Sequence, residues 1–273
     1  MSQQALTPEQ HDEFSRRGVL RIEGLLSPAR VTTAREFVLR RMQQFGLWED
    51  GAWRLGDRPK PKYPDTGLKT SKVVGNKHQE LEALVEEPAL RAAVDALNGG
   101  RPFDRRMHPR PQLLFTLPNA DAWMLPTAWH ADAPRLPSRE RPGVQLFACL
   151  DHIAPRGGGT LMIAGSHLLL DDGRHVRARD LRRELGREAF FRPLWAAQPT
   201  RWEDDEALPS GVVGNVALQV MELTGAPGDG YLVDLRTLHS GAPNAADRPR
   251  MMITDRFIRA DLAEEIAATY GWT

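Results

Sequence analysis

The spacing of apolar residues near the N-terminus predicts two helices. The first begins with the run Thr-Pro-Glu-Gln at 7–10, which supplies an N-cap, a proline at the first helical position and a capping-box glutamine. It should run through Phe14. The pair Ser-Pro at 27–28 repeats the cap and the proline without the capping box. Apolar residues then follow at helical spacing: Val31, Ala34, Phe37, Val38 and Met42.

Residues 50–77 separate these helices from a third helical pattern. This stretch is rich in Gly, Pro and Lys and is predicted to be a loop. Helical spacing then returns in a further set of apolar residues: Leu81, Leu84, Val85, Leu90 and Val94. We expect Pro88 to break or restart that helix, because proline lacks an amide hydrogen and clashes with the preceding turn. The predicted N-terminal helices therefore occupy about residues 7–98.

Strands are expected to dominate from about Gln112 onward. Over residues 231–238, alternate residues form two sets, one for each face of an extended chain. This pattern predicts a strand that leads directly to His239. The segment 239–250 is rich in Gly, Pro, Asn and Asp, the residues of turns. Residues 251–258 then predict another strand. The chain is therefore expected to be mainly β with flanking α-helices.

The composition favours one domain, residues 1–273, and a small ligand. A chain of 273 residues with 41% hydrophobic residues can bury a full core. Its 36 basic and 36 acidic residues cancel, so no positive field favours nucleic acid or a membrane, and a small-molecule substrate is expected. The single cysteine, Cys149, excludes an intramolecular disulfide, and no signal segment or bilayer-length apolar run is found. We therefore expect a cytoplasmic protein.

The candidate chemistry lies in the run Trp-His-Ala-Asp at 129–132. Alternate residues of an extended segment project to the same side, so His130 and Asp132 can both point inward. A distant strand carrying His239 can be brought alongside when antiparallel sheets fold into a jelly roll. Two imidazoles and one carboxylate on one face of a metal, with three positions open, are the ligands that a non-haem Fe(II) oxygenase uses to bind cosubstrate and O₂.

A histidine and an aspartate two positions apart also occur without a metal. The chain has eight histidines, and His130 and Asp132 could form an ordinary hydrogen-bonded pair at a strand end. His152 and His167 compete for the role of ligand. His152 has no partner at ligand spacing, however, and His167 follows a Gly-Ser turn that it would stabilise.

Arg250 is the candidate anion-binding residue. Its guanidinium presents a planar fork of donors that matches a carboxylate, as a dicarboxylate cosubstrate requires. Arg248 lies two positions earlier and would point to the same side of an extended chain. It lies within the turn and before Pro249, however, so Arg250 is preferred. Gln112 is a further candidate for contact with the cosubstrate. The alternative for Gln112 is a plain amide at the end of a strand.

Together these motifs resemble the phytanoyl-CoA dioxygenase family of Fe(II)/2-oxoglutarate oxygenases. In that family the distal histidine is followed by an asparagine five residues later and by the cosubstrate-binding arginine eleven residues later. Asn244 and Arg250 stand at these offsets. The glycine-rich turn that leads to Gly-Ser-His in the family is matched at 157–161 and 165–167. The resemblance extends roughly over residues 6–258.

The resemblance implies a double-stranded β-helix, which is a cupin-like jelly roll. In it His130, Asp132 and His239 would bind Fe(2+), and Arg250 would bind 2-oxoglutarate. The implied reaction uses O₂, releases succinate and CO₂, and hydroxylates an unactivated C–H bond of a small metabolite. Because Asp132 supplies the carboxylate that related halogenases lack, hydroxylation is favoured over halogenation. Desaturation and cyclisation stay open.

Two departures from the family pattern concern secondary contacts. The family often has a hydroxyl residue two positions after the distal histidine, whereas Gly241 stands there and the hydroxyl falls at Ser240. The proline that usually precedes Gly-Ser-His is replaced by Ala164. Neither change touches a predicted metal ligand.

Three other classes of protein would share part of this pattern. A jelly roll that binds metal without turnover would have no use for Arg250. A zinc hydrolase could use two histidines and a carboxylate, but would need neither the arginine nor O₂. A non-catalytic interaction module is not supported, because the sequence shows no peptide groove and no basic stripe.

Residues 168–215 form an insertion between Gly-Ser-His and the distal strand. It carries many basic and aromatic residues: Arg182, Arg183, Arg187, Arg192, Trp195, Arg201 and Trp202. Long insertions on a rigid scaffold commonly cover the pocket and select the substrate, so a lid is one interpretation. A solvated helical excursion is the other. Trp123 and Trp129 are expected to form pocket wall.

Overall fold

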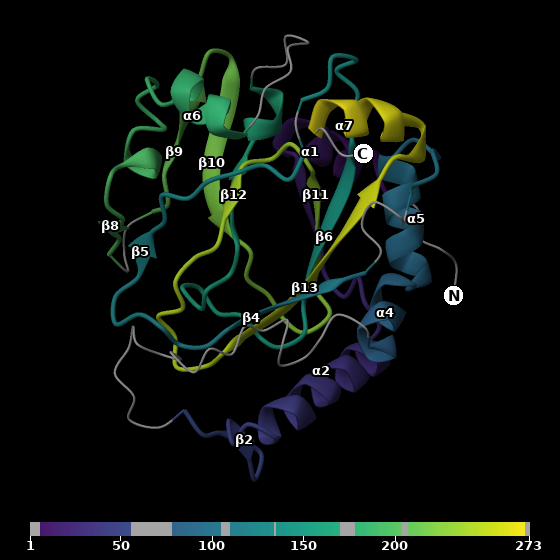
Figure 1. Ribbon diagram of the computed structural model, residues 1–273, viewed down its shortest axis with the longest axis vertical. Coiled ribbons are helices and arrows are strands. Elements are labelled where there is room, and N and C mark those ends of the chain that lie inside the picture. The colour runs from purple at the N-terminus through teal and green to yellow at the C-terminus, as the bar shows by residue number, and fades with distance from the viewer. Residues whose placement is uncertain are drawn as a thin grey trace.

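Two antiparallel sheets form the centre of the protein. The computed structural model describes residues 6–55, 78–104, 110–133, 135–169, 178–203 and 207–270. The larger sheet has the strand order β1 (Val19–Ile22), β11 (Gly230–Asp234), β6 (Gly143–Cys149), β13 (Arg250–Ile258) and β4 (Gln112–Thr116). The smaller sheet has the order β12 (His239–Ser240), β7 (Leu161–Ala164), β10 (Val216–Glu222) and β9 (Ser210–Val213). The two sheets lie on opposite sides of the interior (Figure 1). This confirms the predicted mainly β jelly roll.

The larger sheet is buried on both faces. Inward side chains such as Phe147, Tyr231 and Met252 pack between the sheets against Met162 of β7. The alternate, outward side chains pack with the N-terminal helices in one large cluster, to which the sheet contributes Val144, Leu146, Ala148, Leu232, Met251, Ile253 and Phe257. All seven residues of β6 and eight of the nine residues of β13 are therefore buried, and burial does not alternate along these strands.

The predicted N-terminal helices form at the predicted places. Helix α1 (Pro8–Arg17) has the full capping box between Thr7 and Gln10, and α2 (Pro28–Gln43) follows. Pro88 restarts the third helical pattern, which divides into α4 (Gln79–Val85) and α5 (Pro88–Leu97). Ser27 is not a side-chain cap, because its hydroxyl donates to Glu87. In Figure 1, α2, α4 and α5 follow one another along the outer side of the larger sheet.

Short elements complete the described chain. A small hairpin of β2 (Trp48–Glu49) and β3 (Ala52–Trp53) occupies the start of the predicted loop at 50–77, of which residues 56–77 lie outside the described part. The others are β5 (Met124–Leu125), η1 (Ser166–Leu168), α6 (Ala178–Leu185), η2 (Pro193–Trp195), β8 (Thr200–Arg201), η3 (Ala260–Leu262) and α7 (Ala263–Tyr270). No helix among the described residues is long and apolar enough to cross a bilayer.

The prediction of one strand from 231 to His239 is wrong. Strand β11 ends at Asp234, whose backbone carbonyl accepts from the amide of Thr237 at 2.8 Å. The Asp234 carboxylate also accepts from the backbone and guanidinium of Arg236, at distances between 2.9 and 3.0 Å. These local hydrogen bonds stop the strand in a turn. The chain then crosses to the smaller sheet, where β12 pairs with β7 and His239 lies opposite Met162.

Candidate metal and cosubstrate site

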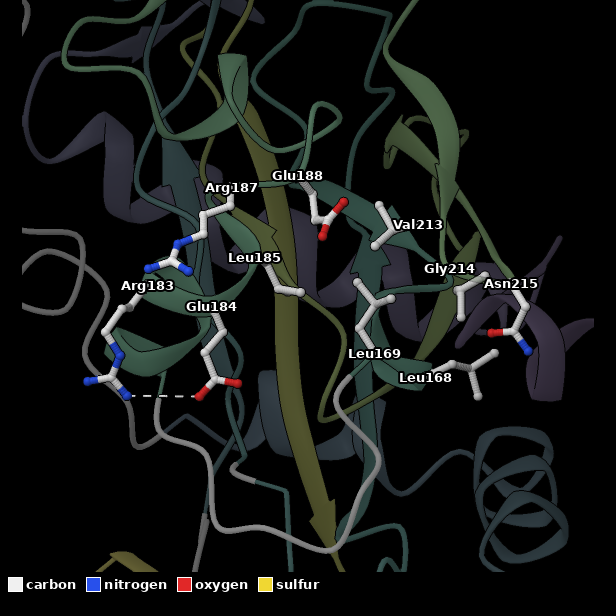
Figure 2. A pocket seen from close by; sticks show the side chains of 11 residues that line it. Leu168, Leu169, Arg183, Glu184, Leu185, Arg187, Glu188, Val213, Gly214 and Asn215 are labelled. Carbon is white, nitrogen blue, oxygen red and sulfur yellow. Dashed lines mark ion pairs between the residues drawn. The ribbon is translucent and has the colours of Figure 1, made fainter.

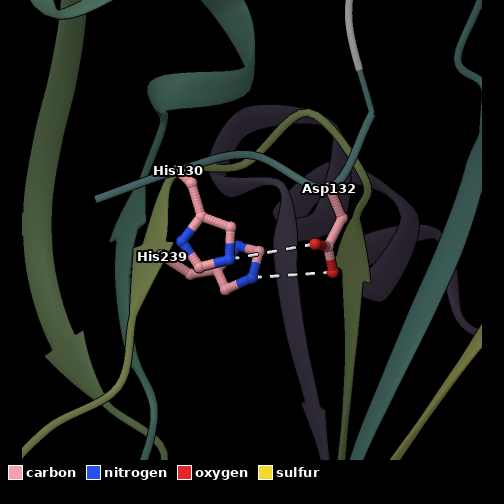
Figure 3. A group of neighbouring side chains, drawn as sticks. All are labelled: His130, Asp132 and His239. Carbon is pink, nitrogen blue, oxygen red and sulfur yellow. Dashed lines mark ion pairs between the residues drawn. The ribbon is translucent and has the colours of Figure 1, made fainter. Parts of the chain in front are cut away.

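Backbone pairing brings the remote metal-ligand candidates together. The amide of His130 donates to the carbonyl of His239 at 3.0 Å, and the amide of His239 donates back at 2.8 Å. The amide of Ala133 donates to the carbonyl of Leu235 at 2.9 Å, which extends the antiparallel contact. One potential ligand atom each from His130, Asp132 and His239 lies within 4.8 Å of the others (Figure 3). Residues 130–133 are therefore held beside residues 235–239 by an isolated β-bridge and one further hydrogen bond, without a regular strand.

His239 is buried in the form that suits a metal ligand. Its Nδ1 lies 3.1 Å from the carbonyl of Thr237, which can only accept, so Nδ1 carries the proton and Nε2 keeps its lone pair. Burial lowers the pKa of His239 below its ordinary value, although Asp132 opposes this. Nε2 of His239 lies 3.6 Å from Oδ2 of Asp132. The His130 ring, whose Nε2 is 3.9 Å from Oδ1 of Asp132, is about half exposed and marks the open side of the cluster.

Asp132 is held ionised by its neighbours. Burial alone would raise the pKa of its carboxyl, but electrostatic interactions with His239 and Arg256, with hydrogen bonds from Arg256 and Gln145, lower this pKa below its usual value. Arg256 donates from Nε and Nη2 to the same oxygen, Oδ2, at 2.9 and 2.8 Å. Two imidazoles and one carboxylate that converge from one side fit an octahedral Fe(II) with open positions.

The competing histidines lie elsewhere. His167 is buried in η1, where its Nε2 lies 3.1 Å from the carbonyl of Ser15, and burial lowers its pKa. His152 is exposed and is not part of the ligand cluster. Among the described residues, the only grouping of three potential metal ligands is the one formed by His130, Asp132 and His239.

Arg250 carries a buried charge whose donors are not all used. Arg250 is the first residue of β13, and its buried side chain donates from Nη1 to the hydroxyl of Thr160 at 3.4 Å. Its Nε is buried and has no partner in the described part of the chain. Burial lowers the pKa of Arg250 to about 10, although the carboxyl of Glu222 opposes this. A carboxylate ligand would satisfy both the charge and the unpaired donor.

The other arginine and the glutamine considered from sequence lie apart from Arg250. Arg248 is about half exposed, and its guanidinium lies 3.8 Å from the carboxylate of Asp151. Gln112 is exposed and pairs with Thr254, whereas Arg250 pairs with Thr116. The two side chains are thus separated by four residues of strand, or about 13 Å. The structure does not bring Gln112 beside Arg250.

Thr160 is a site residue that sequence reasoning missed. It follows the glycine turn 157–159, in which Gly158 has φ +80° and a Cβ there would lie 2.9 Å from Cβ of Asn244. The carboxylate of Glu222 accepts from the backbone amides of Arg156 and Gly159 at 2.6 and 3.1 Å and fixes the turn. The glycine motif was visible in the sequence, but only the fold shows that it presents a hydroxyl to the arginine.

Asn244 fastens the turn that precedes β13. Its side-chain amide donates to the carbonyls of Thr116 and Arg248 at 3.1 and 2.8 Å, and its side-chain oxygen accepts from the amide of Ala246 at 3.0 Å. Because Thr116 is the strand partner of Arg250, these bonds set where β13 begins. No pattern in the sequence predicted that Arg256 and Gln145 donate hydrogen bonds to the carboxylate of Asp132.

The described part of the insertion packs near the site. Hydrophobic residues of α6 and η2 share a cluster with Trp129, Trp123 and Leu238. Arg182 donates to the carbonyl of Trp195, and Arg183 lies 3.3 Å from Asp180. A hollow of about 610 Å³ lies between α6 and the β9–β10 hairpin (Figure 2). No metal-ligand candidate lines this hollow.

A sequence comparison now identifies relatives. The sequence model of the family described as phytanoyl-CoA dioxygenase (PhyH) matches residues 14–252. No curated protein matches the chain.

Solved structures share the fold at low sequence identity. The non-heme alpha-ketoglutarate-dependent carbocyclase SnoK from nogalamycin biosynthesis is 20% identical with a TM-score of 0.59, covering 95% of this chain and 87% of its own. HygX from Streptomyces hygroscopicus, with nickel and 2-oxoglutarate bound, is 16% identical with a TM-score of 0.55, covering 94% and 88%. EctD from S. alaskensis, with 2-oxoglutarate and 5-hydroxyectoine, is 14% identical with a TM-score of 0.56, covering 96% and 79%.

We predict that His239→Ala weakens divalent-metal binding by more than about 100-fold, because it removes one of the three ligands. Loss of a residue that only supports a ligand already weakens metal binding by about 10- to 100-fold. Anaerobic titration with Fe(II), followed by tryptophan fluorescence, measures this. His152→Ala is the matched control, since His152 is exposed and outside the cluster. Equal metal affinity in wild type and His239→Ala would remove this histidine from the site.

Asn244→Ala should lower the free energy of unfolding by about 1–3 kcal/mol, because it removes two part-buried hydrogen bonds that the side-chain amide donates. Urea denaturation measures the change. Asn215→Ala, at an exposed turn, should change stability by less than about 0.5 kcal/mol. A similar small effect at Asn244 would show that the turn is held by other contacts.

Proposed function

Because this chain belongs to the phytanoyl-CoA dioxygenase family, it is an Fe(II)/2-oxoglutarate-dependent oxygenase-type enzyme, and we propose that it hydroxylates an unactivated C–H bond of a small-molecule metabolite. Its cofactor is Fe(II), and its cosubstrates are 2-oxoglutarate and O₂. We further propose that residues 1–273 form one catalytic domain. The single buried thiol of Cys149 is in keeping with a cytoplasmic location.

The proposal assigns a role to each residue of the site. His130, Asp132 and His239 would hold the iron, which supplies the oxidising chemistry when O₂ and 2-oxoglutarate are bound. Arg250 would neutralise the far carboxylate of 2-oxoglutarate. The hydroxyl of Thr160 would donate to the same carboxylate and so take the place of the hydroxyl that is missing at Gly241. Gln112 stands too far along the sheet to share this carboxylate, and a contact of its amide with another part of 2-oxoglutarate stays a proposal.

The buried guanidinium of Arg250 is the observation that carries the proposal. A jelly roll that only stored metal would have no reason to bury an arginine with an unpaired Nε, since burying an unsatisfied charge costs stability. Desaturation or cyclisation by the same site is the runner-up, because substrate placement alone separates these outcomes from hydroxylation. The carbocyclase SnoK, which shares the fold, makes that alternative concrete.

We also propose that the insertion walls the substrate pocket. Its aromatic and aliphatic side chains lie in one hydrophobic cluster with Trp129, the residue before His130. The described arginines of α6 are engaged by Asp180, Glu184 and the carbonyl of Trp195. This favours the cluster over the arginines as the part that faces substrate.

Arg250→Leu should raise the dissociation constant of 2-oxoglutarate by about 10- to 100-fold, because a charge-assisted hydrogen bond is lost. Anaerobic binding to the Fe(II)-loaded protein measures it. Arg248→Leu is the matched control and should leave it unchanged. Succinate release with Fe(II), 2-oxoglutarate, O₂ and a metabolite panel tests the activity itself. Wild-type protein that binds Fe(II) and never forms succinate would contradict the proposed reaction.

Thr160→Val should raise the dissociation constant of 2-oxoglutarate by about 10- to 100-fold, the worth of one hydrogen bond to a charged group. Thr160→Ser keeps the hydroxyl and should bind as wild type does. The same anaerobic titration compares the three proteins. If valine and serine behave alike, the hydroxyl does not reach the cosubstrate.

A further inference from the structure

Arg256 contacts the carboxylate of Asp132 in an unusual way. Both its Nε and its Nη2 donate to one oxygen, Oδ2, at 2.9 and 2.8 Å, where a guanidinium opposite a carboxylate commonly binds both oxygens in parallel. The Asp132 side chain is 11% exposed and that of Arg256 24% exposed, so water screens the pair weakly. The contact is made beside the metal ligands and by a residue that the family motif does not include.

The sheet fixes Arg256 in this position. On β13 it lies directly opposite Gln145 of β6, so both side chains project from the same face of the larger sheet. Gln145 is buried, and its side-chain nitrogen donates to the hydroxyl of Thr254 at 3.0 Å, while its amide also supports the Asp132 carboxylate. Asp132 is thus approached from the sheet by two donor residues whose backbone is locked in a regular ladder.

The number of donors on Oδ2 decides how the carboxylate can bind a metal. The two N–H groups of Arg256 reach Oδ2 from one side and draw its negative charge toward the guanidinium, so Oδ2 is a weaker metal ligand than Oδ1. A metal ion would then bind preferentially through Oδ1. In an octahedral site two imidazoles and one carboxylate oxygen leave three positions, whereas a chelating carboxylate leaves two.

We propose that Arg256 is a positioning residue that keeps Asp132 a one-oxygen ligand and so preserves the third open position on the metal. The inference rests on the proposed function, because 2-oxoglutarate chelates through two positions and O₂ needs the one that remains. Without the guanidinium fork, Asp132 turns and binds the metal through both oxygens. Arg256 acts through the aspartate and touches no reacting atom.

The number of water molecules on bound Mn(II) tests this without turnover. Water-proton relaxation per bound Mn(II) reports open positions, so Arg256→Met should lose about a third of the wild-type enhancement as three waters become two. Its affinity for Mn(II) should be kept, because chelation replaces the lost support. Arg256→Lys, which offers a point charge and no planar fork, should fall between the two.

Arg259→Met is the matched control. This arginine follows the same strand and pairs with Glu140 and Asp261 at 2.7 Å, away from the metal ligands. Its loss should lower the unfolding midpoint and leave the relaxation per Mn(II) unchanged. Circular dichroism of each variant shows whether the fold persists, and Arg256→Lys keeps the charge if Arg256→Met does not fold.

Three results would overturn the proposal. Equal relaxation per Mn(II) in wild type and Arg256→Met shows that the fork does not control the carboxylate. A wild-type value in Arg256→Lys shows that charge alone suffices. Failure of the wild type to bind Mn(II) removes the metal site altogether. By contrast, a wild type that binds Mn(II) and not 2-oxoglutarate removes the proposed function, while the relaxation comparison still decides the role of Arg256.

Discussion

The pairing of residues 130–133 with residues 235–239 is the constraint on which the site depends. The ligand candidates come from distant parts of the chain, and two reciprocal backbone hydrogen bonds between His130 and His239 set their separation. This pairing is available only because Asp234 ends β11 in a turn and sends the chain to the smaller sheet. The turn is itself closed by a buried ion pair between Asp234 and Arg236. Local chemistry at the end of one strand therefore determines whether a metal site exists.

Strand β13 links the two ends of the site. Arg250 and Arg256 are six residues apart and of the same parity, so both side chains leave the same face of the sheet, about 20 Å apart along the strand. The guanidinium of Arg250 donates to Thr160, and that of Arg256 donates to Asp132. A register slip of one residue would turn both away from the interior. The pairing of β13 with β4 and β6 over its whole length, and the Asn244 bonds at its start, exclude such a slip.

Local signals in the sequence predicted those parts of the protein that local forces determine. The cap before α1, the start of α2 at Pro28, the restart at Pro88 and the strand after Pro249 depend on neighbouring residues, and the structure has all of them. The end of β11 was missed, because alternation of apolar residues continues past Asp234 while a side-chain hydrogen bond overrides it. Thr160 and Arg256 were missed because their roles arise from cross-strand register, which no local pattern encodes.

The buried charge at Arg250 would favour a dicarboxylate over a neutral ligand. Glu222 is the nearby acid that opposes the loss of its charge, yet burial raises the pKa of Glu222 to about 7, so this carboxyl is only partly ionised near neutral pH. Both oxygens of Glu222 also accept hydrogen bonds from the backbone of the glycine turn. The guanidinium thus keeps an incompletely neutralised charge and an unpaired donor in a low-dielectric interior. A ligand carboxylate offsets both costs at once, so its binding stabilises the folded protein as well as orienting the cosubstrate.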